Sequence, residues 1–450
     1  MRSRVAPGAA GRRAGRAQRE GHGRVLIRGG RVIDPAAGTD GEGDVLVEGG
    51  RIAEVGTGLD AGSAEVVDAA GLVVAPGFVD PHVHLCEPGW EHRETIRSGA
   101  RAAAAGGYTA VCGMPDTDPV VDDPASVGFI VAEGRRAGGA RVFPAAAVSA
   151  GRNGKQLTEF GEVVDAGAVA VTDAGRAVES SVLMRLALQY ALSFDIPVLA
   201  HCEDAGLARG GVMHEGVVST RLGLRGKPAV AEEIGVARDL ALAEATGGRL
   251  HIQRVSTAAA VNLVRLARQR GVRVTAEATP HHLLLTHDVL ASYGTEFKVD
   301  PPLRTAPDAE ALREALADGT IDCVATDHAP RHYDEKEQAF DDAPFGVVGL
   351  ETAFAVLHTR LVRAGALALP ALLERMSTGP ARALGMEGGT LAPGRPADLV
   401  LIDPGLAWTI ESADFVSRGR NTPFDGEGVV GRVVRTMVGG ETVWALDEGA

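Results

Sequence analysis

The sequence predicts an α/β protein in which a (β/α)₈ barrel of the TIM type is joined to a small discontinuous β-sandwich domain. Between about residues 74 and 384, short apolar runs alternate eight times with Ala-, Leu- and Arg-rich stretches, which is the pattern of repeated βα units. Before and after this region, runs of alternating polarity are separated by Gly-rich turns, as in antiparallel strands. Eight units favour a closed barrel, and a doubly wound parallel sheet is the alternative.

The chain begins with a basic segment, residues 1–24, which carries seven arginines and one acidic residue. It has no apolar stretch of the kind found in secretory signals, and we expect a disordered arm outside the fold. The β strands expected around the barrel share alternating polarity, and they are Val25–Ile27, Gly30–Ile33, Asp44–Glu48, Arg51–Glu54, Glu65–Asp68, Ala397–Ile402, Val429–Val438 and Glu441–Trp444. Residues 25–75 and 389–450 are therefore predicted to form one β domain, and residues 76–388 the barrel.

The eight barrel strands are expected where β-branched or apolar runs precede helical stretches. They are Val79–Leu85, Thr109–Met114, Val142–Val148, Ala168–Thr172, Ile196–His201, Leu250–Ser256, Val272–Ala278 and Asp322–Asp327. The C-terminal ends of all strands of a barrel meet at one mouth, where the active sites of such barrels lie. We therefore look for chemistry in the residues that end these strands.

Composition excludes several classes of function. The chain has 45 Lys+Arg against 59 Asp+Glu and a net charge of −14, which argues against a nucleic-acid partner. Hydrophobic residues make up 45% and charged residues 23%, which excludes disorder of the whole chain. No apolar run reaches the roughly 18–20 residues of a membrane span. The four cysteines form no C-x-x-C pair, which predicts reduced thiols and a cytoplasmic protein.

Potential metal ligands stand at the ends of the predicted strands. His82 and His84 end the first strand, and because alternate residues of a strand share a face, both point to the same side. His201 ends the fifth strand and Asp327 ends the eighth. Histidine nitrogen and carboxylate oxygen are ligands of zinc, so these residues predict a metal site in the mouth. His281 and His282, after the seventh strand, are expected to brace the barrel rim.

Several segments carry a resemblance that spans nearly the whole chain. They are Pro76–Leu85, His201–Asp204, Ala276–Leu283, Lys298–Arg304, Ala325–Pro330 and Asn421–Gly426. Together they resemble the signature segments of class I dihydroorotase in the amidohydrolase superfamily. Hydantoinase and allantoinase share the first histidine pair, but residues 298–304 and 327–330 are more similar to dihydroorotase. The resemblance implies a hydrolase of pyrimidine biosynthesis that interconverts dihydroorotate and N-carbamoyl-L-aspartate.

The resemblance also implies roles for individual residues. His82, His84, His201 and Asp327 correspond to ligands of Zn²⁺, and Asp327 to the general base that takes a proton from the zinc-activated water. The substrate-binding positions share a place around the mouth, and they are His84, Cys86, Asp116, Asp300, Arg331, Phe345 and Gly346.

The second metal site departs from the family pattern. Ala174 stands where the family has a bridging aspartate, and its neighbour Asp173 would need a local twist to replace it. Arg254 stands where the family has a metal-binding histidine, and its guanidinium stays protonated and repels a cation. No lysine lies on the fourth strand to bridge two metals. We therefore expect one zinc ion, with His201 as the only clear ligand left in the second site.

The substrate positions depart as well, and three hypotheses stay open. Cys86 replaces an arginine of the family, Asp116 and Asp300 replace asparagines, and Arg331 replaces a histidine, so added carboxylates are expected to oppose a dianionic substrate. The first hypothesis is a dihydroorotase-type cyclic amide hydrolase. The second is a catalytically impaired assembly partner of another pyrimidine enzyme such as aspartate transcarbamoylase. The third is an amidohydrolase with an altered substrate, and any of the three could form a homo-oligomer.

Overall fold

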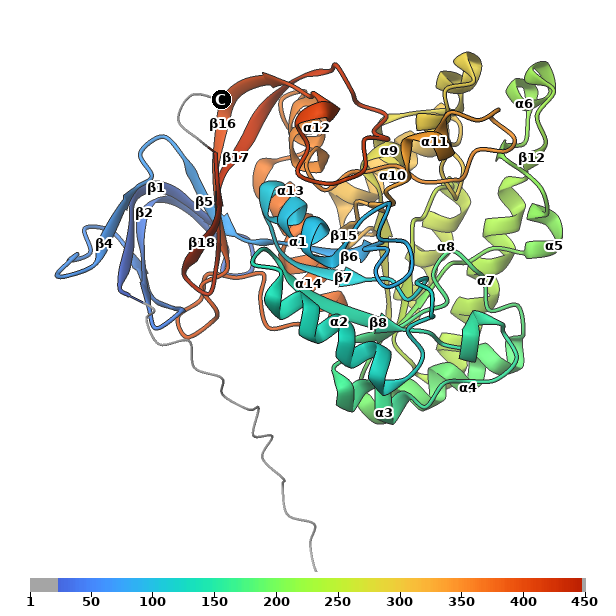
Figure 1. Cartoon of the computed structure of the whole chain (residues 1–450), viewed down its shortest axis with the longest axis horizontal. Coiled ribbons are helices and arrows are strands. Elements are labelled where there is room, and N and C mark those ends of the chain that lie inside the picture. The colour runs from blue at the N-terminus through green and yellow to red at the C-terminus, as the bar shows by residue number, and fades with distance from the viewer. Residues whose placement is uncertain (1–22, 447–450) are drawn as a thin grey trace, which may run out of the picture.

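The barrel dominates the structure, a computed structural model that describes residues 23–446 (Figure 1). Of the predicted basic arm, only Gly23 and Arg24 lie within the described residues. The barrel strands are β6 (Phe78–Val83), β7 (Tyr108–Gly113), β8 (Arg141–Ala146), β9 (Ala170–Val171), β10 (Val198–Ala200), β13 (Leu250–Ile252), β14 (Val274–Ala278) and β15 (Cys323–Val324). Each overlaps one of the eight predicted strands.

The eight barrel strands are parallel and follow one another in chain order around the ring. A parallel bridge between Val83 and His328 joins the two ends, and the His84 amide donates to the His328 carbonyl at 2.8 Å. The sheet therefore closes on itself. The predicted barrel is confirmed, and the alternative of an open doubly wound sheet is wrong.

Helices surround the barrel, and they are α1 (Ile96–Ala105), α2 (Pro124–Arg136), α3 (Phe160–Ala166), α4 (Ser181–Ala191), α5 (Ala205–Ala208), α6 (Val217–Leu222), α7 (Ala229–Thr246), α8 (Ala258–Gln269), α9 (Pro280–Leu284), α10 (Ala306–Asp318), α11 (Tyr333–Lys336), α12 (Ala353–Leu357), α13 (Leu369–Met376) and α14 (Thr378–Leu384). Local sequence explains where they begin and which side is buried. Helix α8 follows the N-cap Thr257, whose hydroxyl accepts from the Ala260 amide at 3.2 Å. Its apolar residues recur with helical spacing and face the barrel.

Strands from both ends of the chain form a second, eight-stranded sheet beside the barrel (Figure 1). They are β1 (Val25–Asp34), β2 (Thr39–Glu48), β3 (Arg51–Gly56), β4 (Glu65–Asp68), β5 (Val73–Pro76), β16 (Leu399–Thr409), β17 (Gly428–Val438) and β18 (Glu441–Ala445). The two ends meet where β5 pairs antiparallel with β16. The first two predicted strands are one strand, β1, with an irregularity between Ile27 and Gly30. Division of the chain into domains at residues 75 and 389 stays a prediction.

Long connections at the C-terminal ends of the barrel strands build the mouth. The connection after β10 contains α5, α6 and the short pair β11 (Met213–His214) and β12 (Gly226–Lys227). The connections after β14 and β15 add α9 and α11. No helix among residues 23–446 combines the length and apolar character needed to cross a membrane.

Candidate metal centre and active-site mouth

Several residues at the mouth adopt backbone conformations that side chains other than glycine rarely take. Cys86, Ala174, Arg254 and Asp327 follow β6, β9, β13 and β15, and their φ angles are 61°, 20°, 51° and 51°. Such conformations cost free energy and persist where the surrounding structure imposes them, typically at functional sites. The strain marks the mouth independently of any motif.

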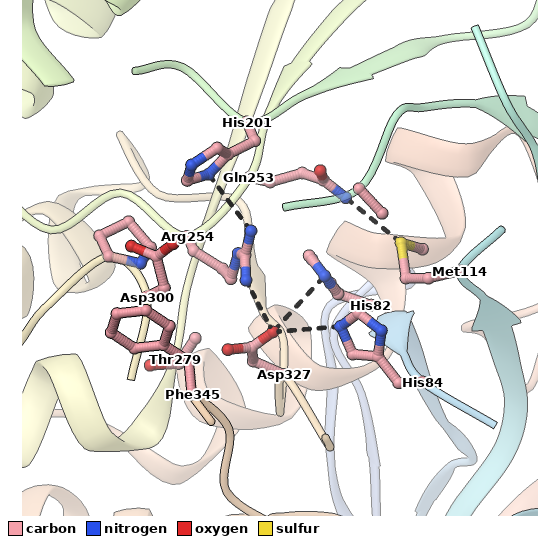
Figure 2. Close-up of polar contacts among 12 residues, drawn as sticks. His82, His84, Met114, His201, Gln253, Arg254, Thr279, Asp300, Asp327 and Phe345 are labelled. Carbon is pink, nitrogen blue, oxygen red and sulfur yellow. Dashed lines mark hydrogen bonds and ion pairs between the residues drawn. The ribbon is translucent and has the colours of Figure 1, made fainter. Parts of the chain in front are cut away.

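His82 presents one ring nitrogen to the centre of the mouth. Its Nδ1 lies 2.8 Å from Glu277 Oε1. Its Nε2 lies 3.5 Å from Asp327 Oδ1 (Figure 2). The side chains of His82 and Glu277 are fully buried. Burial lowers the pKa of His82, so the ring is neutral and its Nε2 can offer a lone pair. A carboxylate behind a histidine in this way fixes the tautomer and orientation that metal binding requires.

His84 is oriented in the same manner by a different carboxylate. Its Nδ1 lies 2.8 Å from Asp116 Oδ1, and its Nε2 lies 3.8 Å from Asp327 Oδ1. Burial would raise the pKa of Asp116, but His84 holds it well below its usual range, so the carboxylate is charged. Both histidines therefore turn their Nε2 atoms toward one oxygen of Asp327.

His82, His84 and Asp327 together fit a metal ion. One ligand atom from each lies within 4.8 Å of the others. In a tetrahedral zinc site with bonds of about 2.0–2.1 Å, neighbouring ligand atoms are roughly 3.3–3.4 Å apart. The separations of 3.5 and 3.8 Å to Asp327 Oδ1 are close to this value. The predicted first metal site is thus brought together by β6 and the end of β15.

Arg254 lies between Asp327 and His201 (Figure 2). Its Nη1 donates to Asp327 Oδ1 at 3.1 Å, and its Nη2 donates to His201 Nδ1 at 3.2 Å. Burial would raise the pKa of Asp327, but Arg254 and the two histidines lower it well below its usual range. His201 is therefore connected to the first site through a guanidinium.

The remaining predicted ligand of the second site is directed elsewhere. The Asp173 carboxylate accepts from the Ser149 amide at 3.0 Å and from the Ser149 hydroxyl at 2.6 Å. Ala174 contributes only a methyl group to the mouth. The structure does not bring Asp173 to the metal-ligating group, because its carboxylate is used to hold the loop after β8.

The two added carboxylates of the substrate positions are both paired. Asp116 is bound by His84, and Asp300 Oδ1 accepts from Lys227 Nζ at 2.6 Å. Burial would raise the pKa of Asp300, but Lys227 lowers it. Their negative charges are therefore compensated inside the protein, and the repulsion of an anionic substrate that the sequence suggested is reduced.

The other substrate positions line or border the mouth. Cys86 is buried, and burial raises the pKa of its thiol to about 12, so it is an inert neutral group. Arg331 Nε donates to the Phe345 carbonyl at 2.7 Å, which leaves the end of the guanidinium directed at the cavity. The Gly346 carbonyl accepts from Asn421 at 3.0 Å, so this backbone is held by the protein itself.

The mouth encloses a cavity of about 240 Å³. Arginines outnumber carboxylates in it, and its lining residues are His84, Asp116, Arg152, Ala174, Gly175, Arg176, Arg254, Asp300, Asp327, Ala329, Arg331, Phe345 and Gly346. Arg152 and Arg176 were not predicted from the sequence. They lie in loops after β8 and β9. A basic residue soon after a barrel strand was the sequence signal that could have identified them. The cavity is suited to a small anion.

Glu277 was also missed, although β14 carried a signal for it. A carboxylate in an otherwise apolar barrel strand has to find a partner inside the barrel. Glu277 accepts from His251 Nε2 at 2.9 Å as well as facing His82. The predicted role of His282 as a brace agrees with its contacts, since its Nε2 lies 2.8 Å from the Pro301 carbonyl and its Nδ1 2.7 Å from the Thr279 hydroxyl.

Solved structures and family models identify the class. The L-hydantoinase (dihydropyrimidinase) from Arthrobacter aurescens superposes with a TM-score of 0.84 at 26% identity and covers 94% of this chain and 97% of its own. The dihydropyrimidinase from Brevibacillus agri gives a TM-score of 0.79 at 25% identity over 93% of this chain and 94% of its own. A family model described as "Amidohydrolase family" matches residues 214–444, half of the chain. The fold is that of an amidohydrolase, and the chain belongs to this class.

More similar relatives narrow the class to one family. A model described as "Dihydro-orotase-like" matches residues 71–260. A protein of Pelotomaculum thermopropionicum named dihydroorotase is 52% identical over 420 residues, which cover 93% of this chain and 98% of the relative. A dihydroorotase of Anaeromyxobacter dehalogenans is also 52% identical, over 94% of this chain and 98% of the relative. The chain belongs to the dihydroorotase family.

Proposed function

We propose that this chain is a dihydroorotase-type cyclic amide hydrolase, which interconverts dihydroorotate and N-carbamoyl-L-aspartate in de novo pyrimidine biosynthesis. The observation that carries the proposal is the first metal site. The Nε2 atoms of His82 and His84 face one oxygen of Asp327, and each histidine is oriented from behind by a carboxylate. Family membership supplies the reaction, and this geometry supports the chemistry that the reaction needs.

The metal proposed for this site is zinc, with one ion per chain. Zinc supplies Lewis acidity, which activates water for attack on an amide carbonyl. His82, His84 and Asp327 would hold it, and Glu277 and Asp116 keep the two histidine rings correctly turned. Only the Oδ1 atom of Asp327 faces the histidines and Arg254, so Oδ2 is the atom we assign to accept a proton and return it to the leaving nitrogen.

The charges of the mouth support an anionic substrate. The positive charges of Arg152 and Arg331 both lower the pKa of Asp116 from a distance. Both side chains donate to backbone carbonyls, and neither forms an ion pair with a carboxylate among residues 23–446. A substrate carboxylate in the cavity would meet these two guanidinium groups. The family has an arginine at the position of Cys86. We propose that Arg152 and Arg331, which come from other elements of the barrel, do the work of that arginine here.

The four cysteines are all free and buried, which supports a reducing compartment, and we infer that the protein acts in the cytoplasm. Association with aspartate transcarbamoylase or with a second copy of the chain stays a prediction. The small-molecule substrate is the partner for which the cavity provides the argument.

Turnover in both directions, measured with the zinc content of the purified protein, tests the proposal. We expect zinc-dependent interconversion of the two metabolites by the wild type and none by the His82→Ala/His84→Ala double variant. The double variant should still fold, because the apolar core of the barrel does not depend on the mouth. A wild type that holds zinc but processes only another cyclic amide would overturn the substrate assignment. Equal turnover by both proteins would overturn the metal site.

A further inference from the structure

We propose that the Arg254 guanidinium is a built-in cation that takes the place of a second metal ion, so that one exchangeable metal in the first site lies beside a fixed positive charge in the second. The proposal rests on the proposed function only in that it assumes the first metal site. It concerns the space between Asp327 and His201, where the guanidinium lies (Figure 2).

The guanidinium contacts one member of each of the two groups of potential metal ligands, Asp327 in the first and His201 in the second. Nη1 donates to Asp327 Oδ1, the oxygen that also faces His82 and His84, at 3.1 Å. Nη2 donates to His201 Nδ1 at 3.2 Å. Arginine has only donors, so His201 Nδ1 must be the acceptor in this contact. The lone pair that His201 could give to a metal is therefore already used.

A second fixed cation, Lys227, binds the two carboxylates near His201. Glu203 and Asp300 lie close enough to His201 to form a metal-ligating group with it. Lys227 Nζ donates to both, at 3.1 Å to Glu203 and 2.6 Å to Asp300. Both acidic groups near His201 are therefore paired with one lysine, and this cluster is a salt bridge.

The side of the mouth that faces β9 offers no anionic ligand either. Ala174 has no ligating atom, and the neighbouring Asp173 is turned to Ser149. A divalent ion at this place would have His201 and a shared Asp327 oxygen as ligands and a guanidinium beside it. Two ligands are fewer than zinc requires, and the guanidinium repels the ion.

Retaining a buried arginine here is costly, which indicates a role. Arg254 is 5% exposed, its Nε has no hydrogen-bond partner among residues 23–446, and its φ angle is 51°. Removing a charge from water and holding a left-handed backbone both cost free energy. The guanidinium offsets part of this cost by pairing with the Asp327 carboxylate and donating to His201, which a cation bound between them would also hold.

The proposal predicts competition between Arg254 and the metal of the first site. Both attract the Oδ1 atom of Asp327, and their positive charges repel each other at close range. Removing the guanidinium charge should therefore strengthen metal binding by His82, His84 and Asp327. A side chain that only filled space would have no such effect.

Zinc stoichiometry by elemental analysis after dialysis, and zinc affinity by competition with a chelating dye, test the proposal. The Arg254→His/Ala174→Asp double variant replaces the cation by two ligands, and we expect it to hold one zinc more per chain than the wild type. No gain of zinc overturns the proposal, as do two zinc ions in the wild type. The number of zinc ions per wild-type chain tests the proposed function separately. A wild type without zinc would show that His82, His84 and Asp327 do not form a metal site.

A second variant keeps the test decisive if the double variant does not fold. Arg254→Met removes the charge but keeps most of the volume, and we expect its first zinc to bind at least roughly tenfold more tightly than in the wild type. Arg176→Met is the matched control, because Arg176 lines the same cavity while its contact is to the Arg152 carbonyl at 3.2 Å. Equal affinities for Arg254→Met and the wild type, or an equal gain in the control, overturn the proposal.

Discussion

Replacing Glu277 by glutamine should weaken zinc binding, although Glu277 is not expected to touch the metal. Its carboxylate accepts from His82 Nδ1 at 2.8 Å and from His251 Nε2 at 2.9 Å. Both ring nitrogens act as donors to it, so Glu277 must be an acceptor on both oxygens. A glutamine has one acceptor and one donor end, and in either orientation its NH₂ group faces a ring N–H.

The magnitude follows from the burial of this group. The side chains of Glu277, His82 and His251 are 0% exposed, so no water compensates a lost bond. A buried hydrogen bond to a charged group contributes about 1.5–3 kcal/mol. Loss of a carboxylate behind a metal-binding histidine typically reduces metal affinity by about 10–100-fold. We expect Glu277→Gln to show both effects, with a melting temperature lower by roughly 2–3 °C for a chain of this size.

Zinc titration and thermal denaturation of the apo and zinc-bound forms measure the two effects separately. His251→Ala is the control, because it removes the other partner of Glu277 and leaves the contact to His82 intact. It should lower the melting temperature while changing zinc affinity by less than about threefold. If Glu277→Gln binds zinc as tightly as the wild type, or if the control loses as much affinity, the assignment of Glu277 as an orienting residue is wrong.

Two further predictions concern other buried charges. Lys227→Met leaves Glu203 and Asp300 without their lysine partner, which should cost about 3–5 kcal/mol of stability. Arg270→Met, at an exposed ion pair, should cost at most about 1 kcal/mol. Denaturant unfolding measures both losses, and equal losses would contradict the role given to Lys227. Burial raises the pKa of Glu351 to about 7 from 4.5, so the unfolded chain releases this proton first and stability falls as pH rises from about 4.5 to 7. Glu351→Gln should flatten this decline in melting temperatures, and an unchanged slope would refute the assignment.

The sequence by itself determined the barrel and the grouping of His82, His84 and Asp327 at its mouth. Eight apolar runs each give a buried strand, because a strand covered on both sides has to be apolar along its whole length. His82 and His84 share a face because alternate residues of a strand do so. The end of the eighth run places Asp327 at the same mouth, since parallel strands of a barrel all end on one side. These conclusions require only local periodicity and the topology of the fold.

Only the tertiary structure decided how the charges of the mouth are paired. Glu277 orients His82 across 195 residues of sequence, and Lys227 neutralises Asp300 across 73. From the sequence, Asp300 is expected to repel an anionic substrate, because its partner Lys227 lies far from it along the chain. Arg254 likewise reads as the loss of a ligand, and the structure shows it spanning Asp327 and His201. Charge pairing depends on distances of about 3 Å between remote residues, and one-dimensional patterns do not encode those distances.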